Sequence, residues 1–149
     1  MTEVLFYHLQ GRPLEAVLPP LLEKSLERGW RVVVQTGSRE RRDALDAHLW
    51  TFRDDSFLPH GTASDGPGAD QPVFLTEGQD NPNGATVRFL VDRAAPPDLA
   101  PYERAVFVFD GTDEEALAEA RLRWKEGKAA GFAVTYWQQS SNGRWERKA

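Results

Sequence analysis

The chain has 149 residues, of which 40% are hydrophobic and 28% charged, and its formal net charge is -5. These fractions exclude global disorder and are typical of a folded domain, so we expect one domain over residues 1–149. Cysteine is absent, which excludes a disulfide framework, a thiolate metal site and a cysteine nucleophile. We find no apolar run of about eighteen residues and no basic leader, and we therefore expect a cytoplasmic protein.

The charge is distributed unevenly along the chain. Residues 121–149 hold seven Lys or Arg and two Glu, a balance of +5, whereas residues 1–120 hold 11 bases and 21 acids, a balance of -10. A basic C-terminal fifth on an acidic body indicates a local site for an anionic partner, although a solvated basic tail would give the same composition. The net negative charge argues against a protein that coats nucleic acid over its whole surface.

The chain opens with a strand pattern and then a helix pattern. Residues 4–9 are a nearly continuous apolar run, typical of a strand that is buried on both faces. An apolar stripe over residues 14–26 predicts a helix that stops at Gly29. Within it, Pro19-Pro20 predicts a kink or a helix that restarts at Pro19.

The same alternation continues over the next twenty residues. Residues 31–36 predict a second buried strand, and Ser38 is a suitable N-cap for a second helix that runs to Trp50. The order strand, helix, strand, helix favours a parallel sheet with right-handed crossovers.

The middle of the chain is rich in turn-forming residues. Residues 51–71 contain three glycines and two prolines among polar residues, which predicts a long loop. A loop of about twenty residues in a compact domain is more often functional or mobile than accidental. Residues 72–76 and 86–91 predict two strands separated by the breaker-rich segment 79–84.

The C-terminal third returns to an α/β pattern. Residues 105–110 predict a buried strand, a helix follows from Asp113, and residues 132–137 predict a last strand. Residues 138–149 are expected to form an extended or flexible tail. The fold class predicted is a single α/β domain with a mostly parallel sheet flanked by helices.

The sequence motifs of enzymes are missing. No glycine-rich loop ends in Lys-Ser or Lys-Thr, so we predict no nucleotide-binding loop. The three histidines have no spacing that places two of them on one metal ion, and His8 is expected to be a hydrogen-bonded core residue. Ser56 and Ser64 lack the context of a nucleophile elbow. We therefore predict a binding protein with no catalytic residue, metal or cofactor.

The helix after Asp110 carries the most informative pattern. Thr112 followed by Glu115 predicts a capping box at its N-terminus. Further along, three cations surround one large aromatic residue on a single helix face, at the spacing i, i+3, i+4 and i+7. These four residues are Arg121, Trp124, Lys125 and Lys128. Three acidic residues of the helix fall on its far side: Glu115, Glu119 and Glu126.

Two interpretations of this face compete. In one, the bases balance the C-terminal end of the helix and Trp124 fills the core. In the other, the face is a receptor for a short acidic peptide, with Arg121 pairing with a carboxylate and Trp124 supplying an apolar wall. Phosphate groups would contact the same residues, so a direct single-stranded nucleic-acid-binding module that also uses the basic tail and Trp145 is the alternative.

Large aromatic residues in the middle of the chain form a second candidate surface. Trp50 ends the second predicted helix, and Phe57 lies in the long loop among polar residues. Such residues are often tucked into the core. If they are exposed, they are the anchor type that is common at protein interfaces.

Four segments together resemble a known family. They are Phe6-Tyr7-His8-Leu9, Leu49-Trp50 with Ser56-Phe57-Leu58-Pro59-His60, Pro72-Val73, and Arg121-Leu122-Arg123-Trp124-Lys125 with Ala130-Gly131-Phe132. In this order and spacing they are similar to the chi subunit of bacterial DNA polymerase III, an accessory protein of the clamp-loader complex. The resemblance covers nearly the whole chain and implies a Rossmann-like fold without catalytic activity.

The resemblance also implies two protein partners. One is the acidic C-terminal tail of single-stranded DNA-binding protein, whose site in the family matches Arg121, Trp124, Lys125 and Lys128. The other is the psi subunit, or in its place a helicase of the repair type, whose surface matches Trp50 and Phe57. Contact with nucleic acid would then be only indirect. Trp124 stands where other members have Tyr, and residues 138–149 run past the end of some members.

Overall fold

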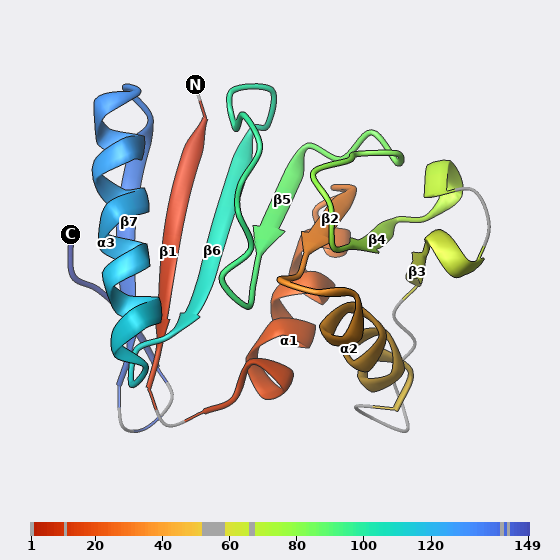
Figure 1. The fold of residues 1–149 in the computed structure, drawn as a ribbon, viewed down its shortest axis with the longest axis horizontal. Helices are drawn as coiled ribbons and strands as arrows, with labels where there is room; N and C mark the ends of the chain where they lie inside the picture. The colour runs from red at the N-terminus through yellow and green to blue at the C-terminus, as the bar shows by residue number, and fades with distance from the viewer. Residues whose placement is uncertain (1, 11, 52–58, 66–67, 141, 143) are drawn as a thin grey trace.

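The computed structural model describes residues 2–10, 12–51, 59–65, 68–140, 142 and 144–149. These residues form one sheet with helices on both of its faces (Figure 1). The helices are α1 (Leu14–Glu27), α2 (Arg39–Thr51) and α3 (Glu114–Ala129). The strands are β1 (Glu3–Leu9), β2 (Val32–Gln35), β3 (Gly61–Thr62), β4 (Val73–Thr76), β5 (Val87–Leu90), β6 (Arg104–Asp110), β7 (Ala133–Gln139) and β8 (Trp145–Arg147).

The sheet has the order β3-β4-β2-β5-β6-β1-β7-β8 over the described residues. Each neighbouring pair is parallel except β7 and β8, which are antiparallel. The predicted fold class, a mostly parallel Rossmann-like α/β sheet flanked by helices, is confirmed. Apolar runs predicted these strands because a strand covered by helices on both faces has no polar face.

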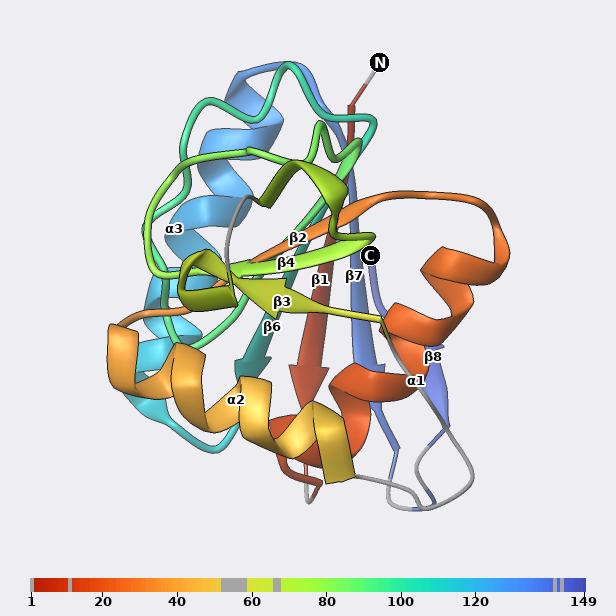
Figure 2. The same ribbon diagram turned by 90° about the vertical axis from the view of Figure 1, so that its right-hand side faces the viewer.

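The two faces of the sheet bury separate cores. Along β1, Leu5 and Leu9 point to the core shared with α1 and α2, whereas Val4 and Phe6 point to the core under α3. Figure 2 shows α1 and α3 on opposite sides of the sheet, with β8 on the side of α1. None of the described helices combines the length and the apolar character needed to cross a bilayer.

Helix α1 passes through both prolines as one helix. Pro19 and Pro20 lie inside Leu14–Glu27, so the predicted restart of the helix at Pro19 does not occur. Pro19 is buried on the core face, where its packing compensates the backbone hydrogen bond that a proline cannot donate. The helix ends at Glu27, and Gly29, the predicted stop, follows its C-cap Arg28; the φ of 78° at Gly29 lets Trp30 N–H reach the Ser25 carbonyl (3.1 Å).

Two segments expected to be irregular contain strands. Within the predicted loop 51–71, β3 pairs with β4 and extends the sheet at that end. Within the predicted tail 138–149, β7 continues to Gln139 and β8 folds back against it, with Ser140 N–H donating to the Arg144 carbonyl (2.7 Å). Polar edge strands of two or three residues hold together by backbone pairing, which leaves no apolar periodicity to detect.

Candidate functional site

Helix α3 begins after β6, and Asp113 caps its N-terminus. The Asp113 carboxylate accepts hydrogen bonds from the backbone N–H groups of Glu115 (3.0 Å) and Ala116 (3.3 Å). The predicted capping box at Thr112 is wrong, because the Thr112 hydroxyl donates instead to Asp110 Oδ1 (2.6 Å). The helix therefore starts one residue later than the motif indicated.

Trp124 lies half-buried on the side of α3 that packs against the sheet. Its indole makes edge-to-face contacts with Phe6 of β1 and Tyr136 of β7, at ring-centroid distances of 5.8 and 5.9 Å. The Lys128 ammonium lies 5.1 Å from the centre of the indole, in a cation–π contact. Trp124 thus contacts the core and still keeps part of its surface in solvent.

The three predicted cations of this helix face are exposed. Arg121, Lys125 and Lys128 form no ion pair or side-chain hydrogen bond with another described residue. Burial raises the pKa of the Tyr136 phenol, and the positive charge of Arg121 partly offsets this rise. We call Arg121, Trp124, Lys125 and Lys128 the α3 patch; its role in binding stays a prediction.

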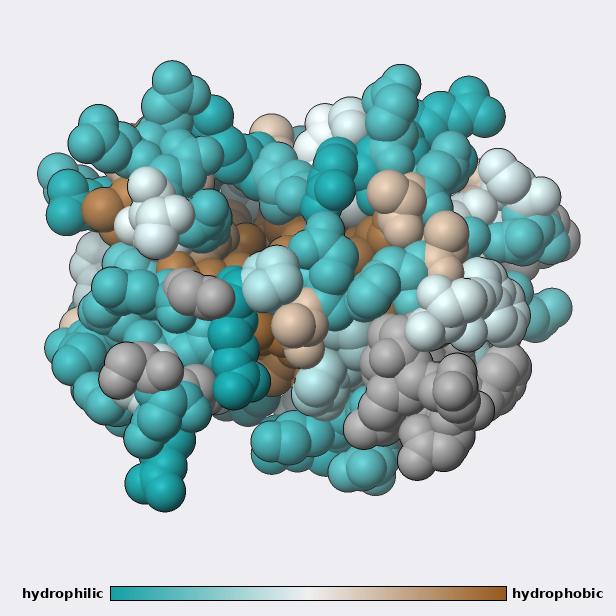
Figure 3. All heavy atoms as spheres, turned by 90° about the horizontal axis from the view of Figure 1, so that it is seen from below, coloured by the Kyte–Doolittle hydropathy of each residue, from teal (hydrophilic) through white to brown (hydrophobic). Residues whose placement is uncertain are grey.

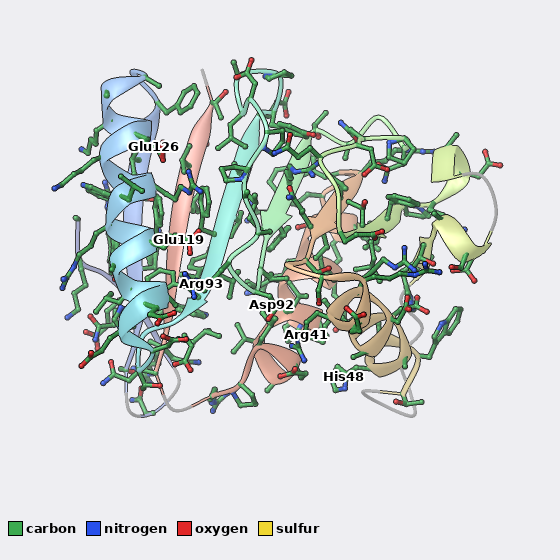
Figure 4. The ribbon with its side chains drawn as sticks, in the orientation of Figure 1. Arg41, His48, Asp92, Arg93, Glu119 and Glu126 are labelled. Atoms are coloured by element: carbon green, nitrogen blue, oxygen red, sulfur yellow. The ribbon has the colours of Figure 1, made fainter. Side chains whose placement is uncertain are left out.

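Three acidic residues of α3 form ion pairs on another side of the helix. Arg93, in the turn after β5, pairs with Glu115 (2.9 Å) and Glu119 (2.7 Å). Arg123 pairs with Glu119 (3.7 Å) and Glu126 (2.9 Å). Figure 4 shows Arg93, Glu119 and Glu126 along this side of the helix. These three acids are therefore paired with arginines outside the α3 patch.

Two aromatic residues beside the α3 patch, Tyr136 and His8, are linked by a hydrogen bond. The Tyr136 hydroxyl forms a 2.7 Å hydrogen bond with His8 Nδ1, and partial burial lowers the pKa of His8. The prediction that His8 is hydrogen-bonded is confirmed, although its side chain is only half-buried. Tyr136 was not predicted. The alternation of Val134 and Tyr136 toward one face of β7 is the signal that could have identified it.

The second predicted surface is described only in part. Trp50, near the C-terminus of α2, is 52% exposed, and its ring centre lies 4.5 Å from that of His60. Phe57 lies outside the described residues, so its pairing with Trp50 stays a prediction. Helix α2 contacts β3 and β4, whereas α3 contacts β1, β6 and β7 (Figure 1). Trp50 and the α3 patch therefore lie at opposite ends of the sheet.

A hollow of about 720 Å³ lies at the carboxyl ends of β1, β5 and β6, the edge where α/β proteins commonly bind ligands. Figure 3 looks onto this edge and shows apolar atoms within a mostly hydrophilic surface. Two acids of the hollow, Glu15 and Asp92, pair with Arg41 at 2.9 and 3.1 Å, and the hydrogen bond from Arg41 lowers the pKa of Glu15. Figure 4 labels Arg41 and Asp92. Among the described residues, no group of three His, Cys, Asp or Glu is placed to hold a metal ion.

Comparison with known proteins relates this fold to a family. A family model described as DNA polymerase III chi subunit, HolC, matches residues 1–135. The chain is 28% identical over 123 residues to the DNA polymerase III subunit chi of Pseudomonas aeruginosa, covering 80% of this chain and 84% of that protein. It is 29% identical over 122 residues to the subunit chi of Escherichia coli, covering 80% and 83%.

A probable DNA polymerase III subunit chi from Rickettsia prowazekii is 29% identical over 100 residues. This alignment covers 67% of the present chain and 59% of the Rickettsia protein, so the chain matches less than two thirds of that relative's length. The family match, in contrast, extends over nearly all of the sheet and all three described helices. The chain therefore belongs to the DNA polymerase III chi subunit family.

Proposed function

We propose that this chain is a non-catalytic accessory subunit of the replicative polymerase clamp loader, and that its α3 patch binds the acidic C-terminal tail of single-stranded DNA-binding protein. Membership of the chi family, whose relatives are named as subunits of DNA polymerase III, supports the accessory role. The choice of partner follows from the family resemblance together with the charge and shape of the patch.

One observation carries the proposal. Arg121, Lys125 and Lys128 are exposed without an ion pair to a described residue, while Glu115, Glu119 and Glu126 of the same helix pair with Arg93 and Arg123. These cations are therefore available to a partner that carries negative charge. Beside them, the half-buried Trp124 offers an apolar surface.

This combination suits a chain end that carries carboxylates and an apolar side chain. The Arg121 guanidinium can pair with a carboxylate in two parallel hydrogen bonds, and the lysines add point charges. The indole would contact the apolar side chain. Because the cations are exposed, salt should weaken the charged part of this binding much more than the apolar part.

The second surface gives the subunit its proposed bridging role. We assign Trp50, together with Phe57, to the psi subunit or to a repair helicase in its place. Trp50 is more than half exposed and lies at the other end of the sheet from the α3 patch, so two partners could bind at once. A bridging subunit needs such separation.

The alternative, one nucleic-acid surface shared by α3 and the C-terminal tail, fits the fold less well. Trp145 packs against the core on the α1 side of the sheet, whereas Trp124 packs on the α3 side. Figure 2 shows β8 and α3 on opposite sides of the sheet. These two aromatic residues therefore do not belong to one continuous surface.

Calorimetric titration with a synthetic tail peptide tests the proposed function. We expect binding by the wild-type chain, weaker binding when the peptide's terminal carboxylate is amidated, and weaker binding by Arg121→Ala. Arg39→Ala removes an exposed arginine from α2 and is the matched control. Equal affinity of wild type and Arg121→Ala would remove the α3 patch from the site.

A further inference from the structure

A separate pocket lies on the face of the sheet opposite α3. Its volume is about 340 Å³, within the range of small-molecule sites, and it lies between α1 and the β7–β8 hairpin over β1 and β6. Its aromatic lining includes Tyr7, Trp30, Trp137 and Trp145. Trp137 and Trp145 follow residue 135, where the family match ends.

The pocket is basic although the chain is acidic overall. Arg12, Lys24, Arg28 and Arg104 line it, and no Asp or Glu does so among the residues that the structure describes. Arg104 pairs with Glu3 at 3.3 Å. The other three cations are exposed and have no ion pair with a described residue. In a chain of net charge -5, such a local excess favours an anionic ligand.

Aromatic rings hold the cations and offer a stacking surface. The guanidinium groups of Arg28 and Arg104 lie 5.0 and 4.9 Å from the centre of the Trp30 ring, so Trp30 positions both at the pocket. Tyr7 and Trp145 pack against each other at 4.8 Å, with their ring planes tilted by 37°. Both rings are half-buried and line the pocket, so part of an aromatic surface remains open to a ligand.

The pocket also contains an unsatisfied polar group. Gln139 lines it and is only 3% exposed, and its Oε1 has no hydrogen-bond partner among the described residues. A buried acceptor without a donor is costly, and proteins rarely retain one without a reason. A ligand that brings an N–H donor would satisfy it.

We propose that this pocket binds a nucleoside phosphate, either free or as one unit of a single-stranded nucleic acid. The base lies against Tyr7 and Trp145, an N–H group of the base donates to Gln139, and the phosphate contacts Arg12, Lys24 and Arg28. Aromatic stacking combined with a basic groove is the general chemistry by which proteins bind single strands. The β7–β8 hairpin, to which the proposed function gives no role, supplies Trp145.

Anisotropy of a fluorescently labelled oligothymidylate, measured at low salt, tests this site. We expect wild-type binding that weakens as salt rises, because phosphate contacts release counterions. Trp145→Ala and Arg28→Gln should each weaken binding at least about fivefold, the low end for the loss of one base–aromatic stack or one charged contact. Arg39→Ala should bind as wild type does. Arg28 is exposed, so Arg28→Gln gives a result even if Trp145→Ala fails to fold.

Competition with thymidine monophosphate and with an acidic peptide identifies the ligand. Displacement of the oligonucleotide by the mononucleotide indicates a free nucleotide site, and no displacement indicates a strand; both outcomes support the proposal. Three results overturn it: no binding of either nucleotide probe, displacement by the acidic peptide alone, or loss of binding in Arg121→Ala but not in Arg28→Gln. Tail-peptide calorimetry on Arg28→Gln should be unchanged, which separates the failure of this site from failure of the α3 patch.

Discussion

The Lys128 ammonium lies 5.1 Å above the Trp124 indole, so the aromatic and cationic parts of the α3 patch are in direct contact. The Trp124 indole also packs edge-to-face against the rings of Phe6 and Tyr136. A rigid indole with a cation fixed over it loses little conformational freedom when a ligand binds, which favours affinity.

Trp124→Ala should weaken tail-peptide binding by about 1–2 kcal/mol. Full burial of a large apolar side chain contributes about 1.5–3 kcal/mol, and the ligand would lose part of this contribution. Trp124→Tyr keeps an aromatic wall and should retain most of the affinity. Calorimetry measures both variants, with circular dichroism as the check on folding. If the Trp124→Ala and Trp124→Tyr variants bind the tail peptide with equal affinity, the indole is only a core residue.

Arg121→Ala should weaken tail-peptide binding by about 1–3 kcal/mol, the usual range for a lost hydrogen bond to a charged group. The difference from wild type should shrink at high salt, because Arg121 is exposed and its charge is screened. Titrations at two ionic strengths measure this. A difference that does not change with salt would argue that Arg121 acts through packing and not through its charge.

Trp50→Ala combined with Phe57→Ala should abolish co-purification with the psi subunit and leave tail-peptide affinity unchanged. The reason is that Trp50 and the α3 patch lie at opposite ends of the sheet. Pull-down with psi and calorimetry with the tail peptide, on the same preparation, measure the two activities. If the double variant still binds psi, Trp50 and Phe57 do not form the psi-binding surface.

The sequence predicted the helices and strands whose buried residues form an apolar run or a periodic apolar pattern. Central strands such as β1 and β6 are continuous apolar runs, and the α3 patch follows from helical spacing alone. The strands β3 and β8 were not predicted, because two or three residues paired through the backbone carry no periodicity. The basic pocket was not predicted either, because it joins Trp30, from the loop after α1, to Trp145, more than a hundred residues later.

The pH dependence of stability should report the state of His8. Partial burial lowers the pKa of His8 in the folded chain, although nearby Asp110 acts in the opposite direction. As pH falls below the ordinary value of about 6.5, the unfolded chain takes up this proton before the folded chain does, so the free energy of unfolding decreases. Urea unfolding from neutral to acidic pH should show a smaller decrease for His8→Gln. Parallel pH curves for the two proteins would contradict the prediction.

Arg88 of β5 is a charged residue that the apolar strand pattern could not explain. It is 0% exposed, and its two bonds to Gln35 Oε1 measure 3.1 and 2.6 Å. Its remaining N–H groups donate to the carbonyls of Gly78 (2.8 Å) and Asp80 (3.0 Å) and to the Tyr102 hydroxyl (3.0 Å). All five guanidinium N–H groups are therefore used, and they tie the loop after β4 to the sheet.

Arg88→Met should destabilise the fold by about 3 kcal/mol or more, because it leaves four oxygens, two of them buried, without this donor at about 1–3 kcal/mol for each buried one. Arg88→Lys should recover only part of this loss, since an ammonium cannot reproduce the planar fork of five donors. Urea unfolding measures both variants, and the exposed Arg39→Ala should stay within about 0.5 kcal/mol of wild type. A change of less than about 1 kcal/mol for Arg88→Met would mean that water or a rearranged loop satisfies these oxygens, and that the buried arginine does not hold the loop.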